Sequence, residues 1–202
     1  MRTLIINGSP RKNGDSMTLI NEMKKHLDGE VTIVHTYYDN ISPCIDCRYC
    51  WKNKGCIIND DMQGVYKLLD EVDNVIIASP VHFSELTGKL LSMASRLQCF
   101  YAYKYIQKNI HFKLKKKNAA LIITGGGDGS AEPAIVSAGI ILRHINAKSI
   151  GTVVSLHTNG IAAKDDAEAL GKAREIALRL NELNKLEKIN AVYEVPDYGK
   201  KS

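Results

Sequence analysis

The chain is 202 residues long, and its 27 Lys and Arg against 22 Asp and Glu give a formal net charge of +5. A single domain of this size buries roughly 70% of the surface of its unfolded chain, so it needs no disulfides to be stable. The mild positive charge favours anionic ligands. Without a basic stripe interleaved with aromatic residues, however, it excludes a typical nucleic-acid-binding protein.

The amino terminus begins with strand-like residues and carries no cationic and then apolar leader. No apolar run approaches the roughly 18 residues needed to span a bilayer. We therefore expect a cytoplasmic protein that makes no use of a membrane. In that reducing compartment, thiols bind metals more often than they form structural disulfides.

Five short apolar stretches predict β-strands. Several are apolar at consecutive positions, which is typical of strands covered on both faces in a parallel sheet. Helical patterns alternate with them without a repeat or a linker. We therefore predict one doubly wound α/β domain over residues 1–188, with a C-terminal tail over residues 189–202. The predicted strands are Thr3–Ile6, Val31–His35, Asn74–Ala78, Ala119–Thr124 and Lys148–Ser155. The predicted helices are Ser16–Leu27, Met62–Glu71, Thr87–Tyr105, Ala131–Ile145 and Asp165–Leu186.

Some individual side chains also have predicted places. Ser16 is the expected cap of the first helix, and Asp60 or Asp61 is the expected cap of the second. The basic run Lys113–Lys117 precedes an apolar strand, so we expect it to be a solvated loop or helix end. Cys99 stands apart from the other cysteines, on a helix, where we expect a buried and inert thiol.

Four of the five cysteines fall in the loop of residues 43–58, with the spacing C-x2-C-x2-C-x5-C. They are Cys44, Cys47, Cys50 and Cys56. Two-residue gaps let one loop present successive thiolates, which are soft ligands, to a metal centre. The pattern is closer to ferredoxin loops than to the paired knuckles of zinc sites, so it favours an iron-sulfur cluster. Reduced structural thiols and regulatory disulfides remain alternatives.

A loop of small residues follows the first strand and leads into a helix. Free backbone N–H groups, hydroxyls and a helix amino terminus can converge there on an anion, and an arginine adds a charge that can bind phosphate in a bidentate way. The loop has neither the P-loop pattern nor the dinucleotide fingerprint. It therefore predicts a phosphate site of another kind, at Ser9, Arg11, Asn13, Gly14 and Ser16.

Two further loops follow the third and fourth strands, and in an open parallel sheet they share an edge with the first loop. The third strand is followed by Pro80, Val81, His82 and Phe83. The flat side chains of His82 and Phe83 can border a planar ligand. The fourth is followed by Gly125, Gly126 and Gly127, where the backbone can approach a ring closely. A phosphate loop and two ring-contacting loops together predict flavin mononucleotide (FMN).

Four stretches of the sequence carry a family resemblance. They are Gly8-Ser9-Pro10-Arg11-Lys12-Asn13-Gly14-Asp15-Ser16, the compact cysteine loop, Asp60-Asp61-Met62, and Ser79-Pro80-Val81-His82-Phe83. The chain resembles the NADPH-dependent FMN reductase family, and within it the iron-sulfur flavoprotein branch. The resemblance covers the first half of the chain strongly. Over the second half it rests only on the order of strands and helices.

The resemblance implies a flavodoxin-like fold with sheet order 2-1-3-4-5, FMN as cofactor, a homodimer or tetramer, and a 4Fe-4S cluster on the four cysteines of the loop. The implied cofactor-binding residues are Ser9, Arg11, Asn13, Gly14, Ser16, Met17, Pro80, Val81, His82, Phe83, Gly125, Gly126, Gly127 and Asp128. The implied cluster ligands are Cys44, Cys47, Cys50 and Cys56.

These features predict an oxidoreductase in which NAD(P)H reduces FMN, and FMN passes electrons to a quinone, to free flavin or to an iron-sulfur acceptor. The flavin carries the chemistry, so no side chain is needed as an acid or a base. One alternative is an iron-sulfur flavoprotein that carries electrons from a ferredoxin-type donor. Another is a non-catalytic module whose cysteines sense redox state or bind zinc.

Overall fold

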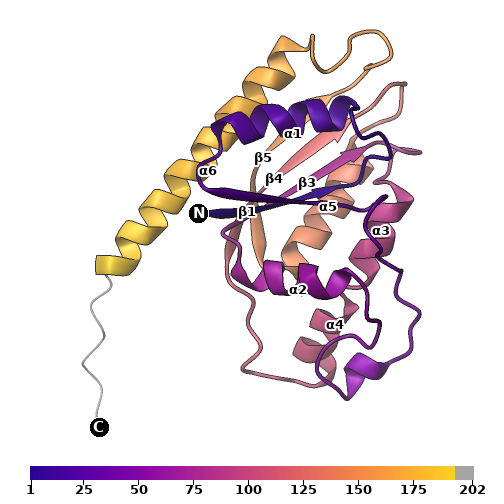
Figure 1. Cartoon of the computed structure of the whole chain (residues 1–202), viewed down its shortest axis with the longest axis vertical. Coiled ribbons are helices and arrows are strands. Elements are labelled where there is room, and N and C mark those ends of the chain that lie inside the picture. The colour runs from indigo at the N-terminus through magenta and orange to yellow at the C-terminus, as the bar shows by residue number, and fades with distance from the viewer. Residues whose placement is uncertain (194–202) are drawn as a thin grey trace.

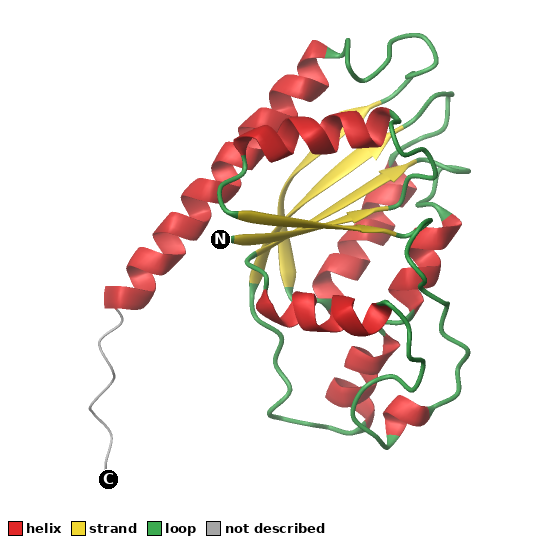
Figure 2. Ribbon diagram, in the orientation of Figure 1, coloured by secondary structure: helices red, strands yellow, loops and turns green. Residues whose placement is uncertain are grey.

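A computed structural model describes residues 1–193 and contains one sheet of five parallel strands in the order β2-β1-β3-β4-β5 (Figures 1 and 2). The predicted fold class and strand order are therefore confirmed. Each strand begins and ends within two residues of its predicted bounds. The strands are β1 (Arg2–Asn7), β2 (Glu30–His35), β3 (Asn74–Pro80), β4 (Lys117–Thr124) and β5 (Ala147–Ser155).

Helices cover both faces of the sheet, as Figure 2 shows. They are α1 (Asp15–His26), α2 (Met62–Glu71), α3 (Gly88–Ser95), α4 (Gln98–Tyr101), α5 (Glu132–His144) and α6 (Ala167–Tyr193). In β1, Leu4 and Ile6 belong to the core on the side of α2, α3 and α5, whereas Ile5 belongs to the core on the side of α1 and α6. Both side-chain sets of a strand are buried, which explains the continuous apolar runs.

The single helix predicted over Thr87–Tyr105 is wrong. Helix α3 ends at Ser95, and after a break come α4 and a π-helical turn at Ala102–Ile106. The break contains neither Pro nor Gly. Arg96 stands in it and is drawn into the interior by Asp60, which lies 36 residues earlier. The ion pair between Arg96 and Asp60 interrupts the helix that the local apolar pattern predicts. Sequence periodicity cannot reveal an ion pair between residues so far apart in the chain.

Two predictions about polar side chains are also wrong. Ser16 does not cap α1, because the cap position is Gly14 and Ser16 lies buried inside the first turn. Lys117 is not part of a solvated run. It begins β4, is 1% exposed, and donates through Nζ to the carbonyl oxygens of Lys115 and Ile145. Burial lowers the pKa of Lys117 to about 8.

Helix α6 is longer than the predicted Asp165–Leu186, because it continues to Tyr193. Residues 189–193 of the predicted tail are thus helical, and residues 194–202 lie outside the described part of the chain. Figure 1 shows α6 passing behind α1, against which it packs, and projecting past the sheet. Within residues 1–193, no helix combines the length and the apolar character needed to cross a bilayer.

Candidate functional site

The loops after β1, β3 and β4 lie next to one another at the carboxyl edge of the sheet, where they are held mainly by hydrogen bonds to the ends of neighbouring strands. The loops after β1 and β3 also contact each other, because Thr87 Oγ1 donates to the Gly8 carbonyl at 2.8 Å. The backbone N–H of Gly8 donates to the Ala78 carbonyl at 2.7 Å, and the N–H of Val81 donates to the Thr124 carbonyl at 2.7 Å. The Oγ of Ser16 lies 2.8 Å from the Oγ1 of Thr124. Three loops that are distant in sequence therefore form one continuous surface, which we call the sheet rim.

In the loop after β1, Ser9 and Arg11 have different roles. Ser9 is buried, and its Oγ accepts a hydrogen bond from the Arg11 N–H at 3.2 Å, so this hydroxyl shapes the turn. The Arg11 side chain is 68% exposed and meets Asp15 at 3.3 Å. The first-turn N–H groups of α1, at residues 15–17, have no acceptor within the helix. Those N–H groups and the free side of Arg11 are the anion-binding elements.

Two residues that support this loop were missed from the sequence. Asn7 is 1% exposed at the end of β1, and its Oδ1 accepts a hydrogen bond from the Ser9 N–H at 2.9 Å. A buried polar residue that ends an apolar strand was the available signal for Asn7. Tyr38 donates from its hydroxyl to the Pro10 carbonyl, and the Lys12 Nζ lies 4.7 Å from its ring centroid. Nothing local in the sequence indicated the role of Tyr38.

The loop after β3 is a tight turn in which His82 and Glu85 exchange two backbone hydrogen bonds, at 2.9 and 3.0 Å. Phe83 and Ser84 occupy its tip with φ of 53° and 61°. Positive φ is rare for a bulky residue such as Phe. The Phe83 side chain is fully exposed, so it is not a plug of the protein core. His82 is also exposed, while Pro80 and Val81 are half-buried against the rim.

The three glycines after β4 differ in how much space surrounds them. A Cβ on Gly125 would lie 2.9 Å from Leu156 Cδ2, and one on Gly126 would lie 2.5 Å from Asn159 Oδ1. Both glycines therefore accommodate the loop after β5. Gly127 has nothing within 4 Å of its hypothetical Cβ, and both Gly127 and the next residue, Asp128, are exposed. Among the three glycines, Gly127 is the one with open space for a ligand.

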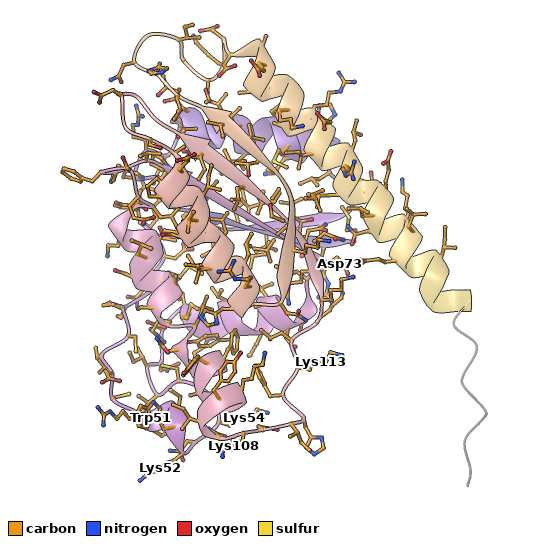
Figure 3. All side chains as sticks on the ribbon, turned by 180° about the vertical axis from the view of Figure 1, so that it is seen from behind. Trp51, Lys52, Lys54, Asp73, Lys108 and Lys113 are labelled. Atoms are coloured by element: carbon orange, nitrogen blue, oxygen red, sulfur yellow. The ribbon has the colours of Figure 1, made fainter. Side chains whose placement is uncertain are left out.

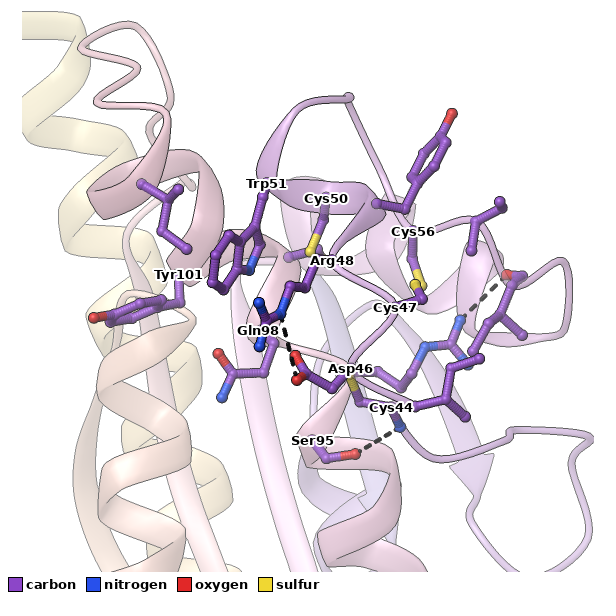
Figure 4. A pocket seen from close by; sticks show the side chains of 17 residues that line it. Cys44, Asp46, Cys47, Arg48, Cys50, Trp51, Cys56, Ser95, Gln98 and Tyr101 are labelled. Atoms are coloured by element: carbon purple, nitrogen blue, oxygen red, sulfur yellow. Dashed lines mark hydrogen bonds and ion pairs between the residues drawn. The ribbon is translucent and has the colours of Figure 1, made fainter.

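A second site lies in the lobe formed by the cysteine loop, α4 and the π-helical turn. All five cysteines are free thiols. The four of the loop, Cys44, Cys47, Cys50 and Cys56, line a cavity of about 420 Å³ together with Ser95, Gln98 and Tyr101 (Figure 4). The Cys44 N–H donates to Ser95 Oγ at 3.0 Å, which attaches the loop to α3. Burial, followed by the neighbouring thiols, raises the pKa of Cys50.

A buried ion pair closes the base of the cysteine loop. The guanidinium of Arg96 donates to both carboxylate oxygens of Asp60, at 2.7 and 3.1 Å. It also donates to the carbonyls of Ser42 and Ile58, which flank the loop. Burial opposes ionisation of Asp60, but the hydrogen bonds from Arg96 and from the backbone N–H groups of Ser42 and Met62, with the charge of Arg96, together outweigh it, and the pKa of Asp60 is lowered. The Arg96 Nε is buried without a partner.

Cys99 lies on α4, so the prediction of a buried thiol on a helix is confirmed, but this thiol is not remote from the other four. It is buried as expected, at 3% exposure, but it lines the same cavity as the cysteine loop. Its desolvation raises the pKa of the thiol to about 12. The bend of the chain at Arg96 brings Cys99 there, and that bend was absent from the helix predicted for this segment.

The sheet rim and the cysteine cavity suit the two cofactors that the sequence indicates, FMN and an iron-sulfur cluster. N–H groups without helical acceptors at the start of α1, the exposed guanidinium of Arg11 and the open space at Gly127 fit a phosphorylated ring system. Within residues 1–193, no three His, Cys, Asp or Glu side chains gather closely enough to hold a single metal ion. Thiols spaced around a cavity fit a polynuclear cluster better than one zinc ion, because a cluster holds its ligands further apart.

The fold and the sheet rim define this chain as a flavodoxin-like α/β protein. The family model described as NADPH-dependent FMN reductase matches residues 1–160, and the chain belongs to that family of FMN-binding oxidoreductases. The chain is 29% identical over 141 residues to a protein named iron-sulfur flavoprotein from Methanosarcina thermophila, covering 68% of this chain and 70% of that protein. A second protein of this name, from Methanocaldococcus jannaschii, is 32% identical over 139 residues, with 67% of each chain covered.

Solved structures show the same fold. An NAD(P)H:quinone oxidoreductase from Methanothermobacter marburgensis superposes with a TM-score of 0.69 at 15% identity, covering 89% of this chain and 96% of that chain. A flavone reductase superposes with a TM-score of 0.68 at 18% identity, covering 92% of this chain and 63% of that chain. At these identities the likeness concerns the arrangement of strands and helices.

Proposed function

We propose that this protein is an oxidoreductase in which NAD(P)H reduces FMN bound at the sheet rim, and the electrons pass to a quinone, to free flavin or to an iron-sulfur centre on the cysteine loop. The observation that supports the proposal is that the loops after β1 and β3 and the start of α1 are each hydrogen-bonded to the end of a neighbouring strand, so that they share one edge of the sheet. The amino terminus of α1 and the exposed turn at Phe83, which in this proposal contacts the ring, therefore lie at the same edge of the sheet. Membership of the FMN reductase family and similarity to proteins named iron-sulfur flavoprotein support it.

In this proposal, the residues of the chain bind and orient the cofactor. The phosphate is held by the first-turn N–H groups of α1 and by Arg11, and the loops at Val81 and Gly127 border the ring. Bound FMN supplies hydride transfer, so the protein needs no acid or base of its own. The Gly125 N–H is donated to the Ser155 carbonyl, so the backbone N–H groups of residues 126–128 are the ones that stabilise negative charge on the reduced ring in this proposal.

The test is anaerobic purification followed by an absorption spectrum, quantitation of flavin and iron, and rapid mixing with NADPH. We expect about one FMN per chain and bleaching of the flavin bands by NADPH without a protein donor. A protein that takes up no FMN would contradict the proposal.

A second candidate is an electron carrier whose flavin is reduced by a ferredoxin-type donor. It is favoured by the cysteine cavity and by the exposure of Cys47 at the outer surface of that lobe. A cluster adds a broad shoulder above the flavin bands, which Cys50→Ser is expected to remove. Flavin that responds to reduced ferredoxin but not to NADPH would establish this carrier in place of the reductase.

We also propose that the protein is a homodimer or tetramer. Phe83 projects fully exposed from the tip of its turn on the rim, where a second copy of the chain can cover both the ring and the flavin. Sedimentation of the purified protein tests this, and a monomer that retains tightly bound FMN would contradict it.

A further inference from the structure

A groove of about 430 Å³ lies on the side of Cys99 away from the cysteine cavity. Helix α2 and the segment from α4 to the π-helical turn line it, and residues 111–114 and Lys54–Gly55 of the cysteine loop complete its wall. None of the predicted flavin-binding residues belongs to it. The groove is large enough for a small organic ligand.

Aromatic rings form the floor of the groove. Phe100 lies 5.5 Å from the Tyr66 ring and 5.6 Å from the Phe112 ring, between centroids, and Phe112 lies 5.1 Å from Tyr103. Tyr66 and Phe112 are only partly buried, so their surfaces remain open to the groove. A connected set of rings with one free side suits a flat apolar body.

The hydroxyl of Tyr103 is a buried donor without a partner. Tyr103 is 7% exposed, and its hydroxyl oxygen forms no hydrogen bond with any residue of the described part of the chain, 1–193. A Cβ on Gly55 would lie 3.8 Å from this oxygen, and Gly55 lines the groove with φ of 86°. Burying an unpaired hydroxyl costs stability, so the position is best explained by a ligand atom that accepts its hydrogen bond.

The edges of the groove are positively charged. Lys54, Lys67, Lys113 and His111 line it, against one acidic residue, Asp70. Over the described residues 1–193, none of these three lysines forms an ion pair. Figure 3 shows Lys54 and Lys113 on the same lobe, with Lys52 and Lys108 beside them. Unpaired cations around an aromatic floor favour a flat ligand with a negative charge.

We propose that this groove is a second binding site, for a small planar compound with an anionic substituent and a carbonyl or similar acceptor, such as a quinone that carries a sulfonate or carboxylate. The ring lies on the aromatic floor, the anionic group meets the lysines, and the Tyr103 hydroxyl donates to the oxygen acceptor.

The position of the groove also gives the ligand a role, and this part rests on the proposed function. Cys99 lines both the groove and the cysteine cavity, so a ligand in the groove lies next to the thiol-lined centre. The ligand is then the electron acceptor. The hydride of NAD(P)H and one solvent proton supply the two electrons and two protons that convert a quinone to its hydroquinone, and NAD(P)⁺ leaves.

Calorimetric titration of the FMN-loaded protein tests the binding, because FMN then occupies the rim. The probe is anthraquinone-2-sulfonate, and the matched neutral probe is 2-(hydroxymethyl)anthraquinone. We expect the sulfonate to bind at least tenfold more tightly than the neutral compound. Equal affinity for the two compounds, or no binding of the sulfonate, would overturn the proposal.

Variants locate the site. Tyr103→Phe is expected to weaken sulfonate binding about fivefold, the size of one neutral hydrogen bond, without lowering the melting temperature, because the hydroxyl has no partner in the protein. Lys67→Gln and Lys113→Gln are each expected to weaken it about threefold. Lys172→Gln on α6 is the control and should change nothing. Full-strength binding in all three groove variants would place the ligand elsewhere.

Steady-state kinetics separate the two proposals. In Tyr103→Phe, we expect a higher KM for anthraquinone-2-sulfonate, with unchanged FMN content and unchanged flavin reduction by NADPH. An unchanged KM with normal flavin reduction would overturn the acceptor role of the groove alone. If NADPH does not reduce the flavin, the proposed reductase fails, and the calorimetric result still decides whether the groove binds the ligand.

Discussion

The sheet rim and the cysteine lobe are built in different ways. The rim consists of short loops between buried parallel strands, and its shape depends on backbone hydrogen bonds such as Gly8 to Ala78. The lobe consists of long segments outside the sheet, and one buried ion pair, Arg96 to Asp60, closes it. The rim therefore follows from the fold itself, whereas the lobe depends on a few particular side chains. Removing those side chains should disturb the lobe and leave the sheet intact.

The largest effect is expected for Arg96→Leu. Both side chains of the ion pair are almost fully buried, at 0% and 4% exposure, so the substitution leaves the Asp60 carboxylate buried and unpaired. We expect a loss of about 3–5 kcal/mol in unfolding free energy, measured with urea, together with loss of iron uptake. Arg48→Leu is the control, because Arg48 is exposed and lies 3.7 Å from Asp46. A loss below about 1 kcal/mol would show that the ion pair does not support the lobe.

The next effect concerns the rim. A Cβ on Gly8 would lie 2.6 Å from Leu90 Cδ1 and 3.0 Å from Leu90 Cβ, so Gly8→Ala must push α3 away. We expect it to destabilise the protein by about 1–3 kcal/mol, as overpacking does. Gly88→Ala, in the first turn of α3, has nothing within 4 Å and should be neutral or slightly stabilising. Similar melting temperatures for the two variants would contradict the close packing of the rim on α3.

A smaller effect is expected for Arg11→Ala, tested by FMN titration. Arg11 is 68% exposed, so we expect a loss of about 1.5 kcal/mol in FMN binding, at the low end for a hydrogen bond to a charged group. Arg2→Ala, at the opposite end of β1, should leave FMN affinity unchanged. If Arg11→Ala binds FMN with wild-type affinity, the phosphate is held by the N–H groups of α1 alone.

The smallest expected effect is the dependence of stability on pH, which should differ between the cysteine lobe and the sheet. The pKa of Asp60 in the folded protein lies below its ordinary value of 3.8, so the unfolded chain binds a proton more readily. The ion pair thus stabilises the protein above pH 3.8, and this stabilisation is lost as the pH falls through the folded pKa. Trp51, the single tryptophan, belongs to the cysteine lobe and reports on it by fluorescence. We expect Trp51 emission to change at a higher pH than the far-ultraviolet circular dichroism of the sheet. Coincident transitions would show that the lobe and the sheet unfold together.

The same contrast explains what the sequence could predict. The bounds of the five strands were predicted closely because a parallel strand that is buried on both faces has a continuous run of apolar residues in the sequence. The meeting of the loops after β1, β3 and β4 was predicted because the carboxyl ends of parallel strands share one edge of the sheet. The lobe was predicted only as a cysteine spacing, since the position of Cys99 depends on a contact between Arg96 and Asp60 that no local pattern contains. For the same reason, the need for Gly125 could not be predicted, because Leu156 from the loop after β5 creates it.

The ion pair at the base of the cysteine loop has one further consequence. Since a single guanidinium binds the carbonyls of both Ser42 and Ile58, the loop leaves and returns to the domain at almost the same point. A loop whose two ends lie this close together tolerates insertions and deletions at its tip, because the entropic cost of loop closure rises only slowly with loop length. The segment between Ser42 and Ile58 is therefore suited to exchange as an independent cassette, through which one flavodoxin-like scaffold could gain or lose a thiol centre without redesign of its sheet.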